Sequence, residues 1–205
     1  EGKNLVGAFW QPSLVLCDTA CLDTLPKAIF RDGCAEGIKY GILFDRDFFD
    51  YLSETGMEFD REYVIERCVA MKRDVVDRDE FDVGARKLLN LGHTIGHSVE
   101  ANSRFTLSHG QSVAIGTAIV ARAAAAKGIL SMEDCGRILK TLRAYGLPED
   151  GFFVRKGGAD QHSVGLGFGG NGSNRAVELP PTAQCLNALG AEITRLPDGF
   201  SVKPV

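Results

Sequence analysis

The sequence predicts a mainly α-helical fold with one or two short strands near its N-terminus. Apolar residues recur at helical spacing through most of residues 24–148. Residues 112–126 are almost wholly small and apolar, which is typical of a deeply buried helix. By contrast, residues 5–17, LVGAFWQPSLVLC, are rich in branched and aromatic side chains around a Gln-Pro break, which favours one or two short strands.

Composition sets the broad class of the protein. With 205 residues, 44% of them hydrophobic, the chain is about the size of one domain and can bury a sizeable core. The net charge of −4 leaves no basic surplus, so neither nucleic acid nor an anionic membrane is an expected partner. No apolar run approaches the roughly 18 residues of a membrane span, and the N-terminal residues do not form a signal peptide. The six cysteines form no C-x-x-C pair, so we expect reduced, buried thiols in a cytoplasmic protein.

Several of the expected helices carry a start or a stop signal. Pro26 falls in the first turn of one helix, Asp45 can cap the next, and Ser108 with Gln111 forms a capping-box pattern. The Tyr-Gly-Leu-Pro sequence at 145–148 is a strong stop. The expected helical ranges are 25–43, 45–52, 59–78, 84–101, 108–126 and 132–144.

The segment 84–101, GARKLLNLGHTIGHSVEA, is expected to form one helix that is apolar around most of its circumference. Gly92 and Gly96 are four residues apart and would form a thin strip where another backbone can approach closely. Four polar residues would share a stripe roughly 60° wide on the same helix. They are Arg86, Asn90, His93 and His97.

A polar stripe on a buried helix needs a partner, because unpaired buried polar groups are costly. A metal ion and an anionic substrate are the two candidates. The H-x-x-x-H spacing of His93 and His97 is weak evidence by itself, since it is also common on a helix face that contacts water. The motif lacks the glutamate that zinc-protease helices use as a base, because Thr94 follows His93.

Other residues with ligand or charge chemistry lie in apolar helical segments. Glu36 and Lys39 are three residues apart and share a helix face, although an ordinary surface ion pair would look the same. Lys72 lies in the third expected helix, and His109 directly follows the Ser108 cap. One carboxylate with two imidazoles is typical of a catalytic zinc site, and the cationic groups suit a phosphate or carboxylate. The residues alone therefore indicate a metal-assisted reaction on a small phosphorylated or carboxylated compound.

Five segments, in order along residues 2–148, resemble the C-terminal half of the 3-dehydroquinate synthase family: GKNLVGAFWQP, GCAEGIKYG, KRDVVDRDE, GARKLLNLGHTIGHSVE and HGQSVAIG. The resemblance implies the helical C-terminal domain of that fold and a metal- and NAD-dependent cyclase of the shikimate pathway. Such an enzyme converts 3-deoxy-arabino-heptulosonate 7-phosphate, a small phosphorylated sugar acid, to 3-dehydroquinate with loss of phosphate. The resemblance also implies Zn²⁺ or Co²⁺ and a recycled NAD⁺ as cofactors, and it is compatible with a homodimer.

The resemblance also implies roles for individual residues. The metal ligands would be Glu36, His93 and His109. The catalytic residues would be Lys39, Lys72 and His97. The substrate contacts would be Lys3, Asn4, Arg86 and Asn90. The residues that bind NAD stay unassigned.

The chain departs from the family pattern near both ends, and these departures divide it into three expected parts. Residues 1–23 are expected to be remnant strands of the family's N-terminal nucleotide domain, the rest of which is missing, and residues 24–148 to be the helical metal and substrate domain. Residues 149–205 form a glycine-rich tail that matches the family poorly. Within it we expect a flexible segment over 150–175, and a short helix and strand over 182–196.

Two other functions remain open from the sequence. A sister sugar-phosphate cyclase, such as 2-deoxy-scyllo-inosose synthase or a sedoheptulose 7-phosphate cyclase, would share the metal motif. A non-catalytic helical fragment that binds metal or oligomerises would share the fold without the reaction. Phosphate release and product analysis would separate the three.

Overall fold

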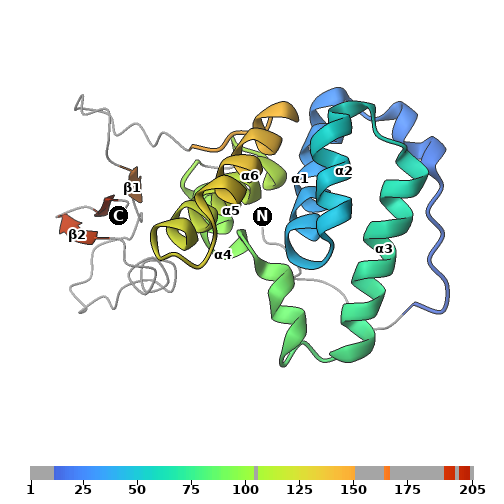
Figure 1. The fold of residues 1–205 in the computed structure, drawn as a ribbon, viewed down its shortest axis with the longest axis horizontal. Coiled ribbons are helices and arrows are strands. Elements are labelled where there is room, and N and C mark those ends of the chain that lie inside the picture. The colour runs from blue at the N-terminus through green and yellow to red at the C-terminus, as the bar shows by residue number, and fades with distance from the viewer. Residues whose placement is uncertain (1–11, 104–105, 151–163, 167–191, 197–198, 204–205) are drawn as a thin grey trace.

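The fold is mainly α-helical, as the sequence predicts. The computed structural model describes residues 12–103, 106–150, 164–166, 192–196 and 199–203. Its helices and 3₁₀ turns follow one another along the chain with short connections (Figure 1). They are η1 (Thr19–Thr24), α1 (Lys27–Phe44), α2 (Arg46–Thr55), η2 (Gly56–Glu58), α3 (Arg61–Arg78), η3 (Ala85–Asn90), α4 (His93–Asn102), α5 (His109–Ala126) and α6 (Met132–Ala144). None of these helices is long and apolar enough to cross a membrane.

The strands expected near the N-terminus are not found in the described residues there. Residues 5–11 lie outside the described part of the chain, and residues 12–18 contain no strand. Leu14, Val15 and Leu16 are instead 82%, 63% and 86% exposed. An isolated extended segment has no ladder to satisfy its backbone groups, and none of the described strands pairs with this one.

The helix starts follow the expected caps. Asp45 accepts the backbone N–H of Phe48 at 3.0 Å and so begins α2. Ser108 and Gln111 form the complete capping box that begins α5. Pro26 is the N-cap of α1, one residue before the position that we expected. The predicted bounds of α6 are those of the structure.

The core surrounds α1, which contacts α2, α3, α5 and α6. Its fully buried side chains include Ile38 of α1, Phe48 and Leu52 of α2, and Leu142 of α6. The Tyr145 hydroxyl donates to the Leu52 carbonyl at 3.0 Å, so the chain after α6 is joined to α2 by a buried hydrogen bond. This core fixes α1 as a rigid base for the site.

Helices α4 and α5 pack with their backbones in close contact, as the Gly92 and Gly96 spacing predicts. A Cβ added to Gly96 would lie 2.9 Å from the Ser112 carbonyl oxygen. A Cβ added to Gly116 of α5 would overlap the Gly92 carbonyl oxygen. Only glycine permits this approach, so the glycines determine how near α4 lies to α5.

The prediction of a single helix over 84–101 is wrong. The 3₁₀ turn η3 ends at Asn90, and α4 starts at His93 after Gly92, which has a left-handed φ of 74°. A left-handed residue ends a helix, and hydrophobic periodicity does not detect it. Arg86 and Asn90 therefore do not share a helix face with the two histidines. The segment is also less buried than expected, since Leu88 is 54% exposed.

The described part of the tail is a small antiparallel sheet in the order β1-β3-β2. It consists of β1 (Val164–Leu166), β2 (Glu192–Leu196) and β3 (Gly199–Lys203). Strand β2 confirms the strand expected within 182–196, whereas the expected helix there lies outside the described residues. Strand β1 lies in the segment that we expected to be flexible. The division of the chain into 1–23, 24–148 and 149–205 stays a prediction.

We expect Gly116→Ala to lower the free energy of unfolding by about 1–3 kcal/mol, because the new methyl group would overlap the backbone of α4. Denaturant unfolding followed by circular dichroism measures this change. The control is Gly136→Ala in α6, where nothing lies within 4 Å of the added Cβ. It should raise the stability by about 0.5–1 kcal/mol. Equal effects of the two substitutions would contradict the close packing of α4 on α5.

Candidate functional site

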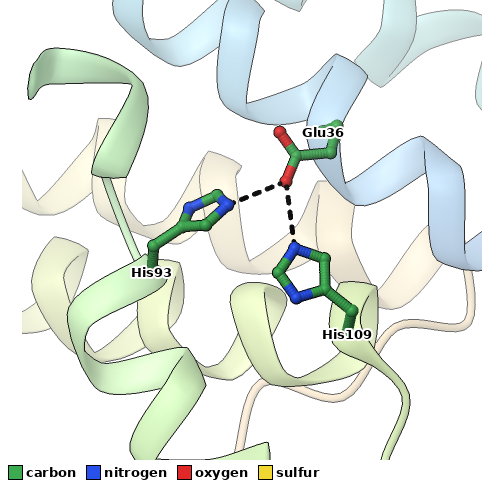
Figure 2. Close-up of side chains that lie close together, drawn as sticks. All are labelled: Glu36, His93 and His109. Carbon is green, nitrogen blue, oxygen red and sulfur yellow. Dashed lines mark ion pairs between the residues drawn. The ribbon is translucent and has the colours of Figure 1, made fainter. Parts of the chain in front are cut away.

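Three side chains from three helices converge at one point. Glu36 comes from α1, His93 is the first residue of α4, and His109 is the first residue of α5 (Figure 2). Glu36 Oε1 lies 3.2 Å from His93 Nε2 and 3.8 Å from His109 Nε2. One possible ligand atom from each of the three lies within 4.8 Å of the others. All three side chains are partly exposed, at 35%, 16% and 31% respectively, so a small ligand can reach them.

Asp32 fixes the start of α5 against α1. It lies one helical turn before Glu36, and its carboxylate accepts hydrogen bonds from the Ser108 hydroxyl and from the Gln111 backbone N–H, the latter at 3.0 Å. The first turn of α5 is therefore capped both by its own serine and by a carboxylate of α1. This contact places His109 opposite Glu36.

Lys39 helps to determine the protonation state and the orientation of the Glu36 carboxylate. Its Nζ lies 2.6 Å from Glu36 Oε2 and donates to the Leu89 carbonyl at 2.7 Å, and its side chain is only 3% exposed. Burial raises the pKa of Glu36, but hydrogen bonds from His93 and Lys39 and the charge of Lys39 outweigh burial and lower that pKa to about 2. Glu36 is thus an anion at neutral pH, which is the form that a metal ion needs.

His97 lies beside the two candidate ligand histidines. It follows His93 by one turn of α4, and its ring centroid is 5.5 Å from that of His93 and 5.7 Å from that of His109. His93 and His109 are themselves 5.3 Å apart. His97 is exposed. The structure thus brings together Glu36 and three of the four histidines of the sequence.

The remaining predicted residues do not join this cluster. Lys72 is exposed on α3, and Arg86 and Asn90 lie on η3. Arg86 donates to the Glu80 carbonyl at 2.9 Å. No hydrogen bond or ion pair in the described part of the chain connects any of these three to Glu36 or to the two candidate ligand histidines. The two other predicted substrate contacts, Lys3 and Asn4, lie outside the described residues.

Asp79 organises the loop that leads to η3, and the sequence analysis missed it. The residue is 8% exposed, and its carboxylate accepts the backbone N–H groups of Val83, Gly84 and Arg86 at 2.9, 2.7 and 2.9 Å. These hydrogen bonds, that from Arg86 first, hold the pKa of Asp79 below its ordinary value. Nothing in VVDRDEFD distinguishes this aspartate from its acidic neighbours, because only the folded loop shows the hydrogen bonds.

Glu100 is a second residue that the sequence analysis missed. Its Oε2 lies 3.4 Å from His109 Nδ1, on the opposite side of the ring from Glu36. Glu100 follows His93 by two helical turns of α4, so both project from the same face. That spacing is visible in the sequence, but the contact with α5 is not.

Comparison with solved structures gives the class of the fold. The chain is similar to a 2-epi-5-epi-valiolone synthase from Streptomyces hygroscopicus subsp. jinggangensis 5008, solved with NAD⁺ and Zn²⁺ bound. The identity is 29% and the TM-score 0.67, over 73% of this chain and 44% of the other. A 2-deoxy-scyllo-inosose synthase complexed with carbaglucose-6-phosphate, NAD⁺ and Co²⁺ shares the fold at 21% identity and a TM-score of 0.64, over 81% of this chain and 51% of the other. The helical fold is thus one found in sugar-phosphate cyclases.

Sequence comparison gives the family. The family model for the 3-dehydroquinate synthase C-terminal part matches residues 33–156, and that for the N-terminal part matches residues 1–32. The chain belongs to the 3-dehydroquinate synthase family. It is 45% identical over 157 residues to a 3-dehydroquinate synthase of Shewanella denitrificans and 46% identical over 154 residues to that of Aliivibrio fischeri. These matches cover 73% and 72% of this chain, which spans only 44% and 42% of the length of the two relatives.

We expect Asp79→Ala to release the loop before η3 and so to lower stability at neutral pH. Because the pKa of Asp79 is lowered by folding, its contribution is present above the ordinary carboxyl pKa and is lost as the pH falls towards the lowered value. Hydrogen exchange of the amides of residues 83–86 and unfolding at several pH values measure the effect. The control is Asp77→Ala, an exposed carboxylate of α3. Unchanged exchange in the Asp79 variant would show that the loop is ordered by other contacts.

Proposed function

We propose that this chain is the metal- and substrate-binding part of a 3-dehydroquinate synthase, which cyclises 3-deoxy-arabino-heptulosonate 7-phosphate to 3-dehydroquinate and releases phosphate. The convergence of Glu36, His93 and His109 from three helices carries the proposal. The curated relatives, at 45–46% identity, favour this reaction over that of the valiolone synthase, at 29%. The activity belongs to a protein of the relatives' full length, of which this chain spans less than half.

The donor set fits a zinc ion. An ionised carboxylate and two imidazoles would supply three ligands, which is the number found in catalytic zinc sites with open positions for substrate oxygens. Glu36, His93 and His109 would hold the metal, and Co²⁺ suits the same nitrogen and oxygen donors. The metal, when bound, would supply Lewis-acid polarisation of a substrate hydroxyl.

The other polar residues would bind and orient the substrate. Lys39 is buried between Glu36 and the Leu89 carbonyl, so its contribution to catalysis would include holding the carboxylate in place. His97 is exposed beside the histidine pair, where it can contact a phosphate or carboxylate of the substrate. Lys72 would be a further catalytic group.

Substrate binding would also involve the loop before α4 and the chain N-terminus. Arg86 and Asn90 of η3 are proposed substrate contacts, as are Lys3 and Asn4. Such positioning groups raise the rate by fixing the reacting geometry rather than by reacting themselves.

NAD⁺ would act as a hydride acceptor and donor that is regenerated in each cycle. The valiolone synthase structure contains NAD⁺ together with Zn²⁺, which supports the same cofactor pair here. The cysteines in the described residues are all free thiols, but the expectation that they are buried is wrong for Cys17 and Cys21, which are exposed. A cytoplasmic location is part of the proposal. The homodimer stays part of the proposal.

We expect His109→Ala and Glu36→Gln each to abolish tight zinc binding by the purified chain, because either change removes one of three ligands. Lys72→Ala should bind one zinc per chain, since Lys72 is exposed on α3 and forms no hydrogen bond or ion pair with the three ligands in the described part of the chain. Chelator-stripped protein, titrated with zinc and analysed by metal content, gives the result. Full zinc content in His109→Ala would show that the ligand assignment is wrong.

The reaction itself is tested in a chimaera. We expect an enzyme whose C-terminal part is residues 1–156 of this chain, joined to the preceding part of the Shewanella denitrificans relative, to release phosphate from 3-deoxy-arabino-heptulosonate 7-phosphate. The activity should need NAD⁺ and zinc, and His109→Ala should abolish it. The matched substrate is sedoheptulose 7-phosphate, which a sister cyclase would prefer. Phosphate release from that sugar alone would contradict the proposed function, and release from neither would favour a non-catalytic fragment.

A further inference from the structure

His109 presents its two ring nitrogens to two different carboxylates. Nε2 lies 3.8 Å from Glu36 Oε1, and Nδ1 lies 3.4 Å from Glu100 Oε2. The Glu100 side chain is 22% exposed and belongs to α4, whereas His109 belongs to α5. The Ser103 hydroxyl donates to the Glu100 backbone carbonyl at 2.7 Å, which fixes the end of α4 around this residue. The ring is thus enclosed by carboxylates from both sides.

A neutral imidazole carries one N–H and one lone pair, so the partner of one nitrogen decides which nitrogen can bind a metal. An ionised carboxylate can only accept a hydrogen bond. Glu100 lies within hydrogen-bond distance of Nδ1, whereas the Glu36 carboxylate, which could accept from Nε2 in the same way, lies beyond that distance at 3.8 Å. Glu100 therefore favours the hydrogen on Nδ1 of His109, which leaves the Nε2 lone pair for a metal between His109 and Glu36. We propose that Glu100 is a positioning residue that sets the tautomer and the ring direction of His109 for metal binding through Nε2. This inference rests on the proposed metal site.

His93 likewise has an acceptor beside each of its ring nitrogens. Its Nδ1 lies 3.2 Å from the Leu91 carbonyl oxygen, and its Nε2 lies 3.2 Å from Glu36 Oε1. The left-handed turn at Gly92 brings that carbonyl beside the ring. Both histidines thus direct Nε2 to the same oxygen, with an acceptor behind each ring. Acceptors in this position raise the affinity of a histidine for metal.

A second arrangement of the same residues competes with this one. His97, Glu100 and His109 also offer ligand atoms within 4.8 Å of one another, and there Glu100 would itself bind the metal. The first arrangement is favoured because Lys39 fixes Glu36 and the Leu91 carbonyl fixes His93. The three residues of the first arrangement are also all partly buried, whereas His97 in the second is exposed.

Two substitutions in the full chain separate these roles. Glu100→Gln keeps an acceptor oxygen, whereas Glu100→Leu removes the acceptor at similar size. Ser98→Ala on the same helix is the control. Long-range ¹⁵N NMR spectra of the metal-free chain at about pH 8.5, where an ordinary histidine is neutral, report the tautomer of His109. Competition with a chromogenic chelator gives the zinc affinity and stoichiometry.

We expect the wild-type ring to carry its hydrogen on Nδ1 and Glu100→Leu to shift the population towards the Nε2–H form. Zinc affinity should fall about 10–100-fold in the leucine variant, and glutamine should restore most of it. A wild-type Nε2–H tautomer would overturn the proposal, and so would glutamine and leucine variants that bind zinc equally weakly. A zinc stoichiometry that falls by one in Glu100→Gln would identify Glu100 as a ligand. If the wild type bound no zinc, the metal site would be wrong, and the NMR spectra would still decide the role of Glu100.

Discussion

The site depends on one anion, the Glu36 carboxylate, which lies where two helices begin. His93 is the first residue of α4 and His109 the first residue of α5, so both side chains reach this carboxylate from the N-terminus of a helix. A helix N-terminus carries a partial positive charge, and each such end favours a nearby anion by up to about 1 kcal/mol. Lys39 adds a full charge at 2.6 Å from the other oxygen. A partly buried carboxylate with these neighbours stays ionised and keeps one oxygen directed at the histidines.

Helix α5 is the common partner that brings the two helix starts to this anion. Asp32 of α1 caps its first turn through the Gln111 N–H at 3.0 Å, and the Gly116 backbone lies against α4. Both contacts involve backbone groups, which deviate less from their mean positions than long side chains do. The separation of the ligands is therefore determined by helix packing, and the ligand side chains need little adjustment of their own.

The sequence predicted those features that local spacing encodes. Glu36 and Lys39 lie on one helix face, as their spacing predicts, and the Gly92–Gly96 spacing predicted a close backbone approach, which α5 makes. The one-helix interpretation failed because a left-handed φ at Gly92 ends the periodicity. The predicted helix placed Arg86 on the same face as the histidines, which the structure does not. The convergence of His93 with Glu36 does not depend on that helix.

No sequence pattern identifies residues whose contacts lie far away along the chain. Asp32 meets Ser108 and Gln111, which follow it by 76 and 79 residues. Asp79 and Glu100 are acidic residues among others, and only their folded neighbours distinguish them. A single sequence records spacing within an element but not which elements pack together. It therefore predicted residues that the structure brings together, Glu36, His93 and His109, but not Asp32 and Glu100, which contact the start of α5.

The balance of charge suggests a role for the second carboxylate, that of Glu100, which lies beside His109 on the side away from Glu36. Lys39 neutralises Glu36, so this pair alone attracts a divalent cation weakly. Glu100 adds negative charge on the far side of the His109 ring, where in the proposed arrangement it would not occupy a coordination position. A carboxylate in that place strengthens the imidazole as a ligand while the open positions of the metal stay free for substrate oxygens. The arrangement thus separates two tasks, since Glu36 would bind the metal and Glu100 would hold the histidine that binds it.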